Sequence, residues 1–149
     1  MSYLLQGILS FIAATAFGIV FNAPKNSLFY CGLVGMTGWL SYSFTDHLSN
    51  DPVKSSFAGA FTIAFVAHLM AKRIKMPMII FSVAGIIPLV PGGVAYNAMR
   101  HIVEEDYGLA IQYASRALMI SGAIAIGLVF AEIIMKLLLM AIKRPKLKP

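Results

Sequence analysis

The chain has 149 residues, of which 59% are hydrophobic and only 12% carry a charge, with a mean hydropathy of +0.80. Average soluble domains carry roughly 25% charged residues, so this composition excludes an ordinary soluble domain and indicates an integral membrane protein made of helices. The net charge of +6 does not indicate a nucleic-acid-binding face. The basic residues lie at the ends of apolar runs, which is how membrane proteins set their orientation.

Five apolar runs, separated by short polar segments, predict five transmembrane helices in a single domain, 1–149. A spanning helix needs about 20 apolar residues, and unpaired backbone groups are costly in lipid, so each unbroken run is expected to be a helix. The predicted spans are about 3–21, 27–44, 55–71, 76–92 and 117–142, followed by a basic cytoplasmic tail at 143–149. The first run lacks the features of a cleaved secretory signal, so we expect it to be retained.

The Lys and Arg residues predict the orientation of these spans, because short cytoplasmic loops carry an excess of both. With the N-terminus outside, the cytoplasmic ends hold eight of them and the outer loops hold three. The eight are Lys25, Lys72, Arg73, Lys75, Lys143, Arg144, Lys146 and Lys148, and the three are Lys54, Arg100 and Arg116. We therefore expect an outside N-terminus and a cytoplasmic C-terminus.

The segment 94–116, between the fourth and fifth runs, is too polar to span a membrane. Its apolar residues recur at roughly helical spacing and predict a short amphipathic helix at the outer surface. Asp106 is a good N-cap residue, and it predicts a second helix that begins near Tyr107 and continues into the last span. The adjacent acids Glu104, Glu105 and Asp106 indicate a solvated outer face.

The fourth run is interrupted by Pro88-Leu89-Val90-Pro91-Gly92-Gly93, which is the most informative feature of the sequence. Two prolines three residues apart remove two helical hydrogen bonds, and the glycines after them add backbone freedom. The interruption predicts a broken helix, which is tolerated at membrane depth only inside protein or beside a water-filled cavity. A tight turn that ends the fourth span at the membrane interface is an equally good interpretation.

Broken helices bind anionic groups in secondary transporters, because the second half-helix presents free N–H groups and a partial positive charge. We expect a substrate carboxylate to face the N–H groups near Gly92 and Gly93, with Tyr96 and Asn97 supplying side-chain hydrogen bonds. The predicted substrate site at the break consists of Pro88, Pro91, Gly92, Gly93, Tyr96 and Asn97.

The run Ile87–Tyr96, with the letters IPLVPGGVAY, resembles the signature of the threonine/serine exporter family. Within that family it is similar to the small membrane-only subunit. The segment 22–26, which leads into a glycine-bearing second helix, and the overall length are also similar to that subunit.

The resemblance implies a subunit of a two-component secondary exporter of small amino acids, threonine or serine, or of small dicarboxylates such as succinate. It also implies a partner that supplies another five-helix half and a cytoplasmic N-terminal extension. The chain would then be one half of an inverted-repeat transporter in the inner membrane of a bacterium. Without this partner, we expect no transport unless the chain forms a homo-oligomer.

Two titratable residues of the predicted spans are candidates for coupling export to the proton gradient. Glu132 is the only carboxylate inside a predicted span, and Lys136 follows one helical turn later. An ion pair between them is the simpler interpretation, and proton uptake and release by Glu132 is the alternative. His68 titrates near neutrality, but its position beside Lys72 favours a structural histidine at the inner interface.

Small residues and asparagines in the first two spans have structural interpretations. Gly32, Gly35 and Gly38 recur at every third position, which is typical of close helix packing in lipid. Asn22 and Asn26 flank Pro24 and are interpreted as a helix stop followed by a cap. The resemblance implies that both asparagines also line the inner mouth of the transport pathway, so they join the predicted substrate-binding residues.

No motif supports enzyme chemistry, a cofactor or a metal site. We therefore expect a proton-driven exporter subunit and not an enzyme. One alternative is a non-transporting assembly subunit that stabilises a partner membrane protein. The other is a membrane-embedded enzyme acting on a lipid, which would need a buried nucleophile or a metal-binding set that the sequence does not offer.

Overall fold

The computed structural model describes residues 3–142, and every regular element in this range is helical. The elements are α1 (Tyr3–Val20), α2 (Lys25–Ser49), α3 (Pro52–Ile74), α4 (Met78–Ile86), the 3-10 turn η1 (Ile87–Leu89), α5 (Gly92–Val103) and α6 (Tyr107–Ile142). The predicted all-α fold class is confirmed. The predicted basic tail, 143–149, lies outside the described residues.

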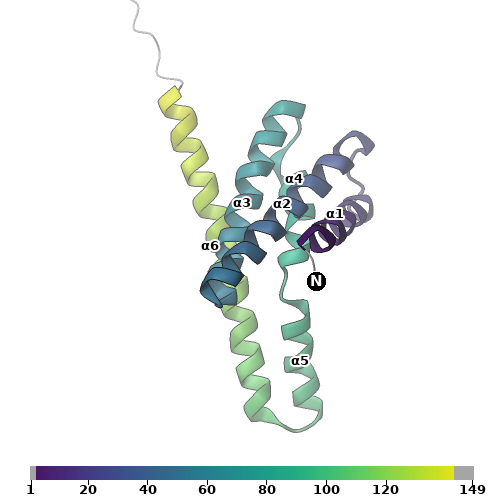
Figure 1. The fold of residues 1–149 in the computed structure, drawn as a ribbon, viewed down its shortest axis with the longest axis vertical. Helices are drawn as coiled ribbons and strands as arrows, with labels where there is room; N and C mark the ends of the chain where they lie inside the picture. Colours follow the sequence, from purple (N-terminus) through teal and green to yellow (C-terminus); the bar gives the residue numbers. More distant parts are fainter. Residues whose placement is uncertain (1–2, 143–149) are drawn as a thin grey trace, which may run out of the picture.

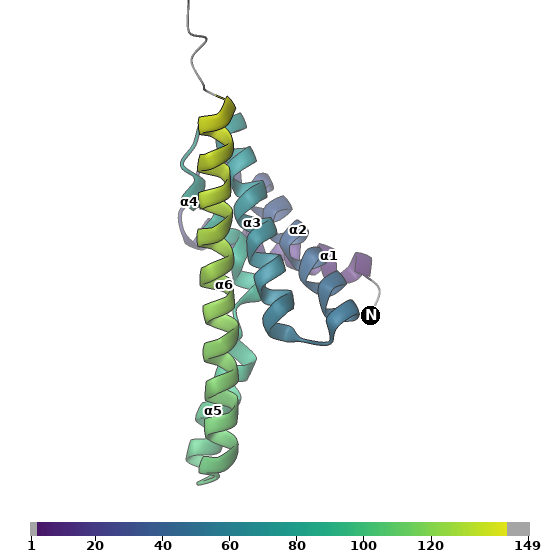
Figure 2. The same cartoon turned by 90° about the vertical axis from the view of Figure 1, so that its left-hand side faces the viewer.

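Helices α2 and α3 form the centre of a bundle (Figure 1). Helix α2 packs against α1, α3 and α4, and the upper part of α6 covers one side of α3. Helix α5 lies apart from this bundle and packs along the first part of α6. Figure 2 shows that α5 and this part of α6 form a hairpin that extends below the ends of α2 and α3.

The structure contains three to four candidate membrane spans within residues 3–142, against the five that we predicted. Helices α1, α3 and α6 are long and apolar enough to cross a membrane, and the bent pair formed by α4–η1 and α5 is the fourth candidate. Helix α2 is long enough but less apolar, because serine, threonine, glycine and tyrosine residues recur along its whole length. Helix α4 has only 9 residues, about 14 Å at 1.5 Å per residue, which is too short to cross a hydrocarbon core of about 30 Å alone.

The glycines of α2 allow the central helices to approach closely, which confirms the packing interpretation. A Cβ atom at Gly32 would collide with Phe11 of α1, and one at Gly38 would collide with Ile63 of α3. Gly127 of α6 has a similar role, since a Cβ atom there would lie 2.8 Å from the carbonyl oxygen of Phe57 in α3. Close backbone approach of this kind supports helix association in lipid.

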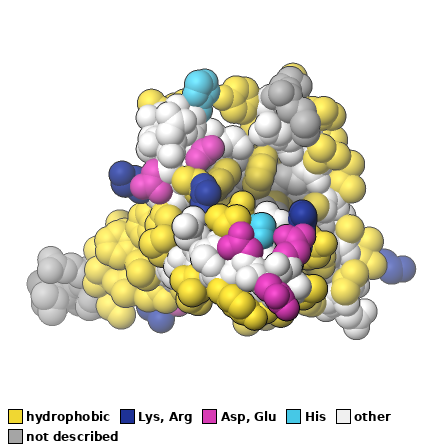
Figure 3. All heavy atoms as spheres, turned by 90° about the horizontal axis from the view of Figure 1, so that it is seen from below, with side chains coloured by type: hydrophobic (Ala, Val, Ile, Leu, Met, Phe, Trp, Pro, Cys, Tyr) yellow, Lys and Arg dark blue, Asp and Glu magenta, His cyan; other side chains and the backbone are white. Residues whose placement is uncertain are grey.

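An aromatic contact joins α5 to α6 in the hairpin, and polar contacts within each helix order its tip. The rings of His101 and Tyr113 stack with centroids 5.3 Å apart, and Arg100 Nε lies 2.8 Å from Glu104 Oε1. Asp106 Oδ1 accepts a hydrogen bond from the N–H of Leu109 at 3.1 Å, so the predicted N-cap of the long last helix is confirmed. In the view from the hairpin end, charged side chains gather at the tip and hydrophobic side chains flank it (Figure 3).

The hairpin projects beyond the bundle because α6 is much longer than α3. Helix α6 has 36 residues, or about 54 Å, whereas the 23 residues of α3 extend about 35 Å. Because α3 alone is long enough for the hydrocarbon core, a bilayer that surrounds α3 leaves the tip of the hairpin outside.

Asp51 caps the start of α3 and gives the fold a testable pH dependence. Its carboxylate accepts the N–H of Val53 at 3.0 Å, and this bond, with Lys54 nearby, holds the pKa of Asp51 below its ordinary value of 3.8. A lowered folded-state pKa means that the ionised group stabilises the fold above about pH 4 and that this contribution is lost as the pH falls through the lowered pKa.

The melting temperature of the detergent-solubilised protein should therefore fall on acidification, and less so for Asp51→Asn, which keeps a capping side chain but does not titrate. Asp51→Ala should melt at a lower temperature already at neutral pH. An acid-side decrease in Asp51→Asn equal to that of the wild type would contradict this role.

Candidate functional site

The fourth apolar run is a broken helix. After η1 the backbone at Val90 is extended, as expected for a residue that precedes proline, and Pro91 occupies the N-cap position of α5. The axes of α4–η1 and α5 differ by 52°, so the chain bends at the break and does not reverse. The geometry therefore matches a broken helix better than a tight turn.

The start of α5 presents backbone N–H groups without partners. No side chain caps this helix, and the N–H of Gly92 is taken by the carbonyl oxygen of Val90 at 2.8 Å. Among the described residues, the N–H groups of Gly93 and Val94 have no hydrogen-bond partner. Two free donors and the positive end of the helix dipole make this a suitable place for an anionic group.

A cavity of about 230 Å³ lies between the break and the bundle. Its wall includes Trp39 and Tyr42 of α2, Pro88 and Pro91 of the break, Val94 of α5 and Arg116 of α6. Pro52, the first residue of α3, also lines it. The break therefore lies level with the start of α3, at the end of the bundle from which the hairpin projects.

Two further cavities adjoin the first one. The larger, of about 450 Å³, is lined by Gln6 of α1 and by Trp39, Tyr42, Ser43, Asp46 and His47 of α2. A smaller one, of about 230 Å³, joins Gln6 to Trp39 and Pro88. All three share Trp39, whose ring stacks on that of Tyr42 with centroids 5.1 Å apart. Helices α1, α2, α5 and α6 thus surround one indented region next to the break.

The predicted substrate residues at the break face two different sides. Pro88 and Pro91 line the cavity, but a Cβ atom at Gly92 or Gly93 would meet nothing within 4 Å. Tyr96 is 68% exposed, and Asn97 is half-buried. One side of the break therefore packs against this chain, and the other side is open.

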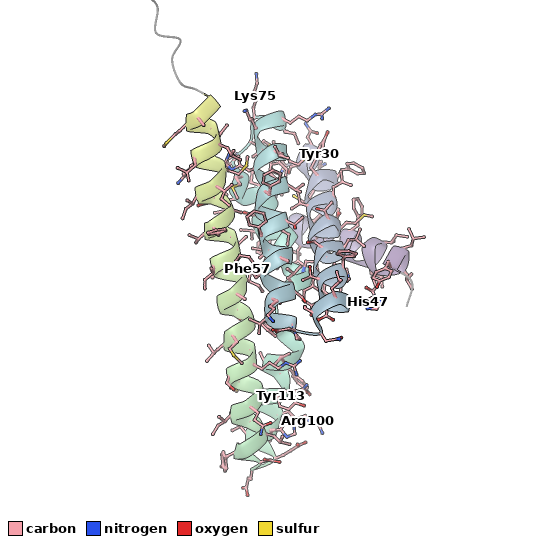
Figure 4. All side chains as sticks on the ribbon, turned by 60° about the vertical axis from the view of Figure 1, so that its left-hand side comes forward. Tyr30, His47, Phe57, Lys75, Arg100 and Tyr113 are labelled. Carbon is pink, nitrogen blue, oxygen red and sulfur yellow. The ribbon has the colours of Figure 1, made fainter. Side chains whose placement is uncertain are left out.

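Asn22 and Asn26 lie far from the break. The first half of α2, marked by Tyr30, is near Lys75, whereas His47 in the last turn of α2 lies towards the hairpin that carries Arg100 (Figure 4). Because the cavities are at the His47 end, the structure does not bring the two asparagines together with the break.

The structural interpretation of the asparagines holds in part. Asn22 has a φ of 55° and ends α1, in the left-handed conformation that asparagine tolerates better than most residues. The expected cap at Asn26 is wrong, because α2 already begins at Lys25 with Pro24 in the N-cap position and no side-chain cap. Asn26 is an exposed residue of the first turn.

This geometry predicts that Asn22 acts through its backbone. Asn22→Gly should export at the wild-type rate, because glycine adopts the left-handed conformation without strain. Asn22→Val should lower the unfolding free energy by roughly 1–2 kcal/mol, measured as a lower melting temperature in detergent. Loss of export in Asn22→Gly with unchanged protein level would show instead that the amide side chain itself takes part.

The two proton-coupling candidates also lie away from the cavities. Glu132 and Lys136 are both exposed, and the described residues contain no ion pair between them, so the simpler interpretation of this pair is wrong. The reason is that α6 packs on α3 through the face that carries Gly127 and Ala131, and Glu132 is turned aside from it. His68 is half-buried, with Nδ1 3.4 Å from the sulfur of Met78.

The sequence interpretation missed the α2 wall of the cavities. Trp39, Tyr42 and Asp46 occupy positions i, i+3 and i+7, a spacing that places them on one helix face. This signal was present, but the second predicted span, 27–44, ends before Asp46 and so separates it from the other two. The contribution of Arg116 had no local signal, because it depends on how α6 packs beside the break.

Comparison with known proteins gives two kinds of match. The family model described as "Threonine/Serine exporter, ThrE" matches residues 6–134. An uncharacterised protein of Haemophilus influenzae is 34% identical over 94 residues, which are 62% of this chain and 31% of that protein. A threonine/serine exporter of Corynebacterium glutamicum is 28% identical over 122 residues, which are 81% of this chain and 24% of that protein.

The chain therefore spans about a quarter to a third of the length of the curated relatives that it matches. No solved structure matches it. The family model covers most of the chain, including the break and the cavities next to it. This chain is a membrane protein that belongs to the threonine/serine exporter family.

Proposed function

We propose that this chain is one subunit of a two-component secondary exporter that moves a small amino acid such as threonine or serine, or a small dicarboxylate, out of the cell. The observation that carries the proposal is the cavity between the break and the bundle, where Arg116 and the start of α5 offer positive charge. In secondary transporters, broken helices of this kind form substrate sites. The proposed action is non-enzymatic, and it is driven by the proton gradient.

The open side of the break supports the proposal of a partner subunit. Gly92, Gly93 and Tyr96 are exposed, and the free N–H groups at this helix start need protein or water around them if they lie in the membrane. The family relatives are three to four times longer than the matched segment. We therefore propose a second five-helix subunit that covers this side, related to the first by an inverted repeat, with five spans in each half.

The proposed orientation places the N-terminus and the hairpin outside and the C-terminus in the cytoplasm of a bacterial inner membrane. Lys72, Arg73 and Lys75 at the end of α3 support it, since basic residues favour the cytoplasmic side. Glu132 and His68 remain the candidates for proton coupling. Their distance from the cavities implies that a coupling role would act through helix movement or through the partner.

The proposal is tested by efflux of labelled threonine, serine and succinate from cells that express this chain with and without a candidate partner, chosen as a five-span protein with its own Pro-Gly break. We expect outward transport of at least one of these solutes only when both proteins are present, and we expect it to stop when the proton gradient is collapsed. Equal efflux from cells with neither protein and from cells with both would contradict the proposal.

A further inference from the structure

We propose that the cavities on either side of the Trp39–Tyr42 pair form one binding site for a zwitterion, in which Asp46 binds the ammonium group and Arg116 binds the carboxylate. The inference rests on the proposed function and makes it more specific, because it assigns the site to an α-amino acid and not to a dicarboxylate. It also gives roles to two charged residues that the interpretation of the break alone does not use.

Asp46 is a half-buried carboxylate without a cationic partner in residues 3–142. It lines the cavity of about 450 Å³, and its one side-chain hydrogen bond within residues 3–142 comes from the hydroxyl group of Ser55, which donates at 3.4 Å. The same hydroxyl makes a shorter bond, 2.9 Å, to the carbonyl oxygen of Asp51. Asp46 takes part in none of the ion pairs of the described region, which involve Asp51 and Glu104.

The position of Asp46 in its helix is unfavourable for a negative charge. It lies three residues before Ser49, the last residue of α2, where the free carbonyl groups already make the helix end negative. Its neighbours on the wall include Ser43, whose hydroxyl donates to Gln6 Oε1 at 3.2 Å, and the exposed His47 of the last turn. A bound ammonium group would offset this repulsion and satisfy the carboxylate.

Arg116 supplies the opposite charge at the break. It is exposed, lines the cavity of about 230 Å³ and has no carboxylate at ion-pair distance in the described region. Val94, whose N–H group is free, lines the same cavity. A guanidinium group and a helix N-terminus together favour a carboxylate ligand.

Tyr42 is common to the two cavities, since it lines both the cavity that includes Asp46 and the cavity that includes Arg116. The stacked Trp39 ring provides an apolar wall beside it. A ligand in this region therefore meets a negative end, an aromatic wall and a positive end.

Charge also explains which small metabolites the site would reject. A dicarboxylate placed with one carboxylate at Arg116 would bring its second carboxylate towards Asp46, and like charges at close range oppose binding. Rejection by an unfavourable charge is a common source of specificity. The site should therefore bind threonine or serine in preference to succinate.

The binding test uses the full-length chain in lipid nanodiscs and the fluorescence of Trp39, which is the single tryptophan of the protein. The probes are L-threonine, N-acetyl-L-threonine without the ammonium charge, L-threoninol without the carboxylate, and succinate. We expect a saturable fluorescence change with threonine and at least about tenfold weaker binding of the other three, the factor that corresponds to one lost interaction of ~1.4 kcal/mol.

Single substitutions test the roles of Asp46 and Arg116 one at a time. Asp46→Asn should weaken threonine binding about tenfold and leave N-acetyl-L-threonine unchanged, whereas Arg116→Gln should weaken threonine and leave L-threoninol unchanged. Glu105→Gln and Arg73→Gln remove exposed charges elsewhere and should bind threonine like the wild type. Circular dichroism and size-exclusion profiles establish that each variant is folded.

The zwitterion site is overturned if threonine gives no saturable change, if succinate binds as tightly as threonine, or if both cavity variants bind threonine like the wild type. Export in cells distinguishes this failure from failure of the proposed function. Undiminished threonine export by Asp46→Asn would overturn the site while the exporter remains. Absence of any export by the wild type with its partner would overturn the proposed function, and the nanodisc titration would still decide the site.

Discussion

Gly92→Leu will leave the protein folded and inserted but will reduce threonine export at least about tenfold, or ~1.4 kcal/mol in the transport barrier. A Cβ atom at Gly92 meets nothing within 4 Å, and its φ is not positive, so leucine fits without strain. The new side chain would occupy the open side of the break, where we place the partner and the pathway. The measurement is efflux of labelled threonine, normalised to the amount of assembled complex in the membrane.

Gly108→Leu is the matched control, because it makes the same change in the exposed hairpin, where the nearest side-chain atom would be 3.6 Å away. It should export like the wild type. The Gly92→Leu variant also distinguishes a transporting subunit from a non-transporting assembly subunit. A non-transporting assembly subunit predicts that Gly92→Leu lowers the amount of complex while each assembled complex exports normally, and that outcome would contradict a transport role for the break.

Gly38→Leu will have the largest effect on stability and will prevent normal accumulation of the protein. A side chain at Gly38 collides with Ile63 and approaches the carbonyl oxygen of Gly59 at 3.4 Å, so α2 and α3 must separate. Overpacking of a dense core costs roughly 1–3 kcal/mol and occasionally more. Because these are the two central helices, we expect the upper end of this range, measured as membrane abundance and as melting temperature in detergent.

Gly122→Leu provides the control for this prediction, since it is a helical glycine of α6 with nothing within 4 Å of an added Cβ atom. It should accumulate normally. Normal abundance and an unchanged melting temperature for Gly38→Leu would show that the close packing of α2 and α3 does not hold the bundle together.

The broken fourth helix, the packing glycines and the helix start at Asp106 could be predicted from the sequence because each has a local cause. Proline lacks the N–H group that a helix needs, glycine permits close approach, and aspartate accepts backbone N–H groups at a helix start. The family resemblance at Ile87–Tyr96 is also a local feature, and the family match confirms it.

The number of spans and the composition of the cavity were harder to predict because they depend on packing between distant segments. Hydropathy ends the second run near Phe44, whereas α2 continues to Ser49 and brings Asp46 and His47 into the helix. Arg116 reaches the break only because α6 is one continuous helix that lies along α5. The pairing of Glu132 with Lys136 was expected from spacing alone, but their exposed face leaves both free to adopt other positions.

Cysteine labelling at Gly93 tests most directly whether the break lies on the export pathway. Gly93→Cys places a thiol on the open side of the break, and the single native cysteine, Cys31, is fully buried and gives little background. We predict that a membrane-impermeant maleimide labels this thiol rapidly in the chain alone, more slowly when the partner is present, and more slowly still when threonine is added. A labelling rate that neither the partner nor threonine changes would contradict the account.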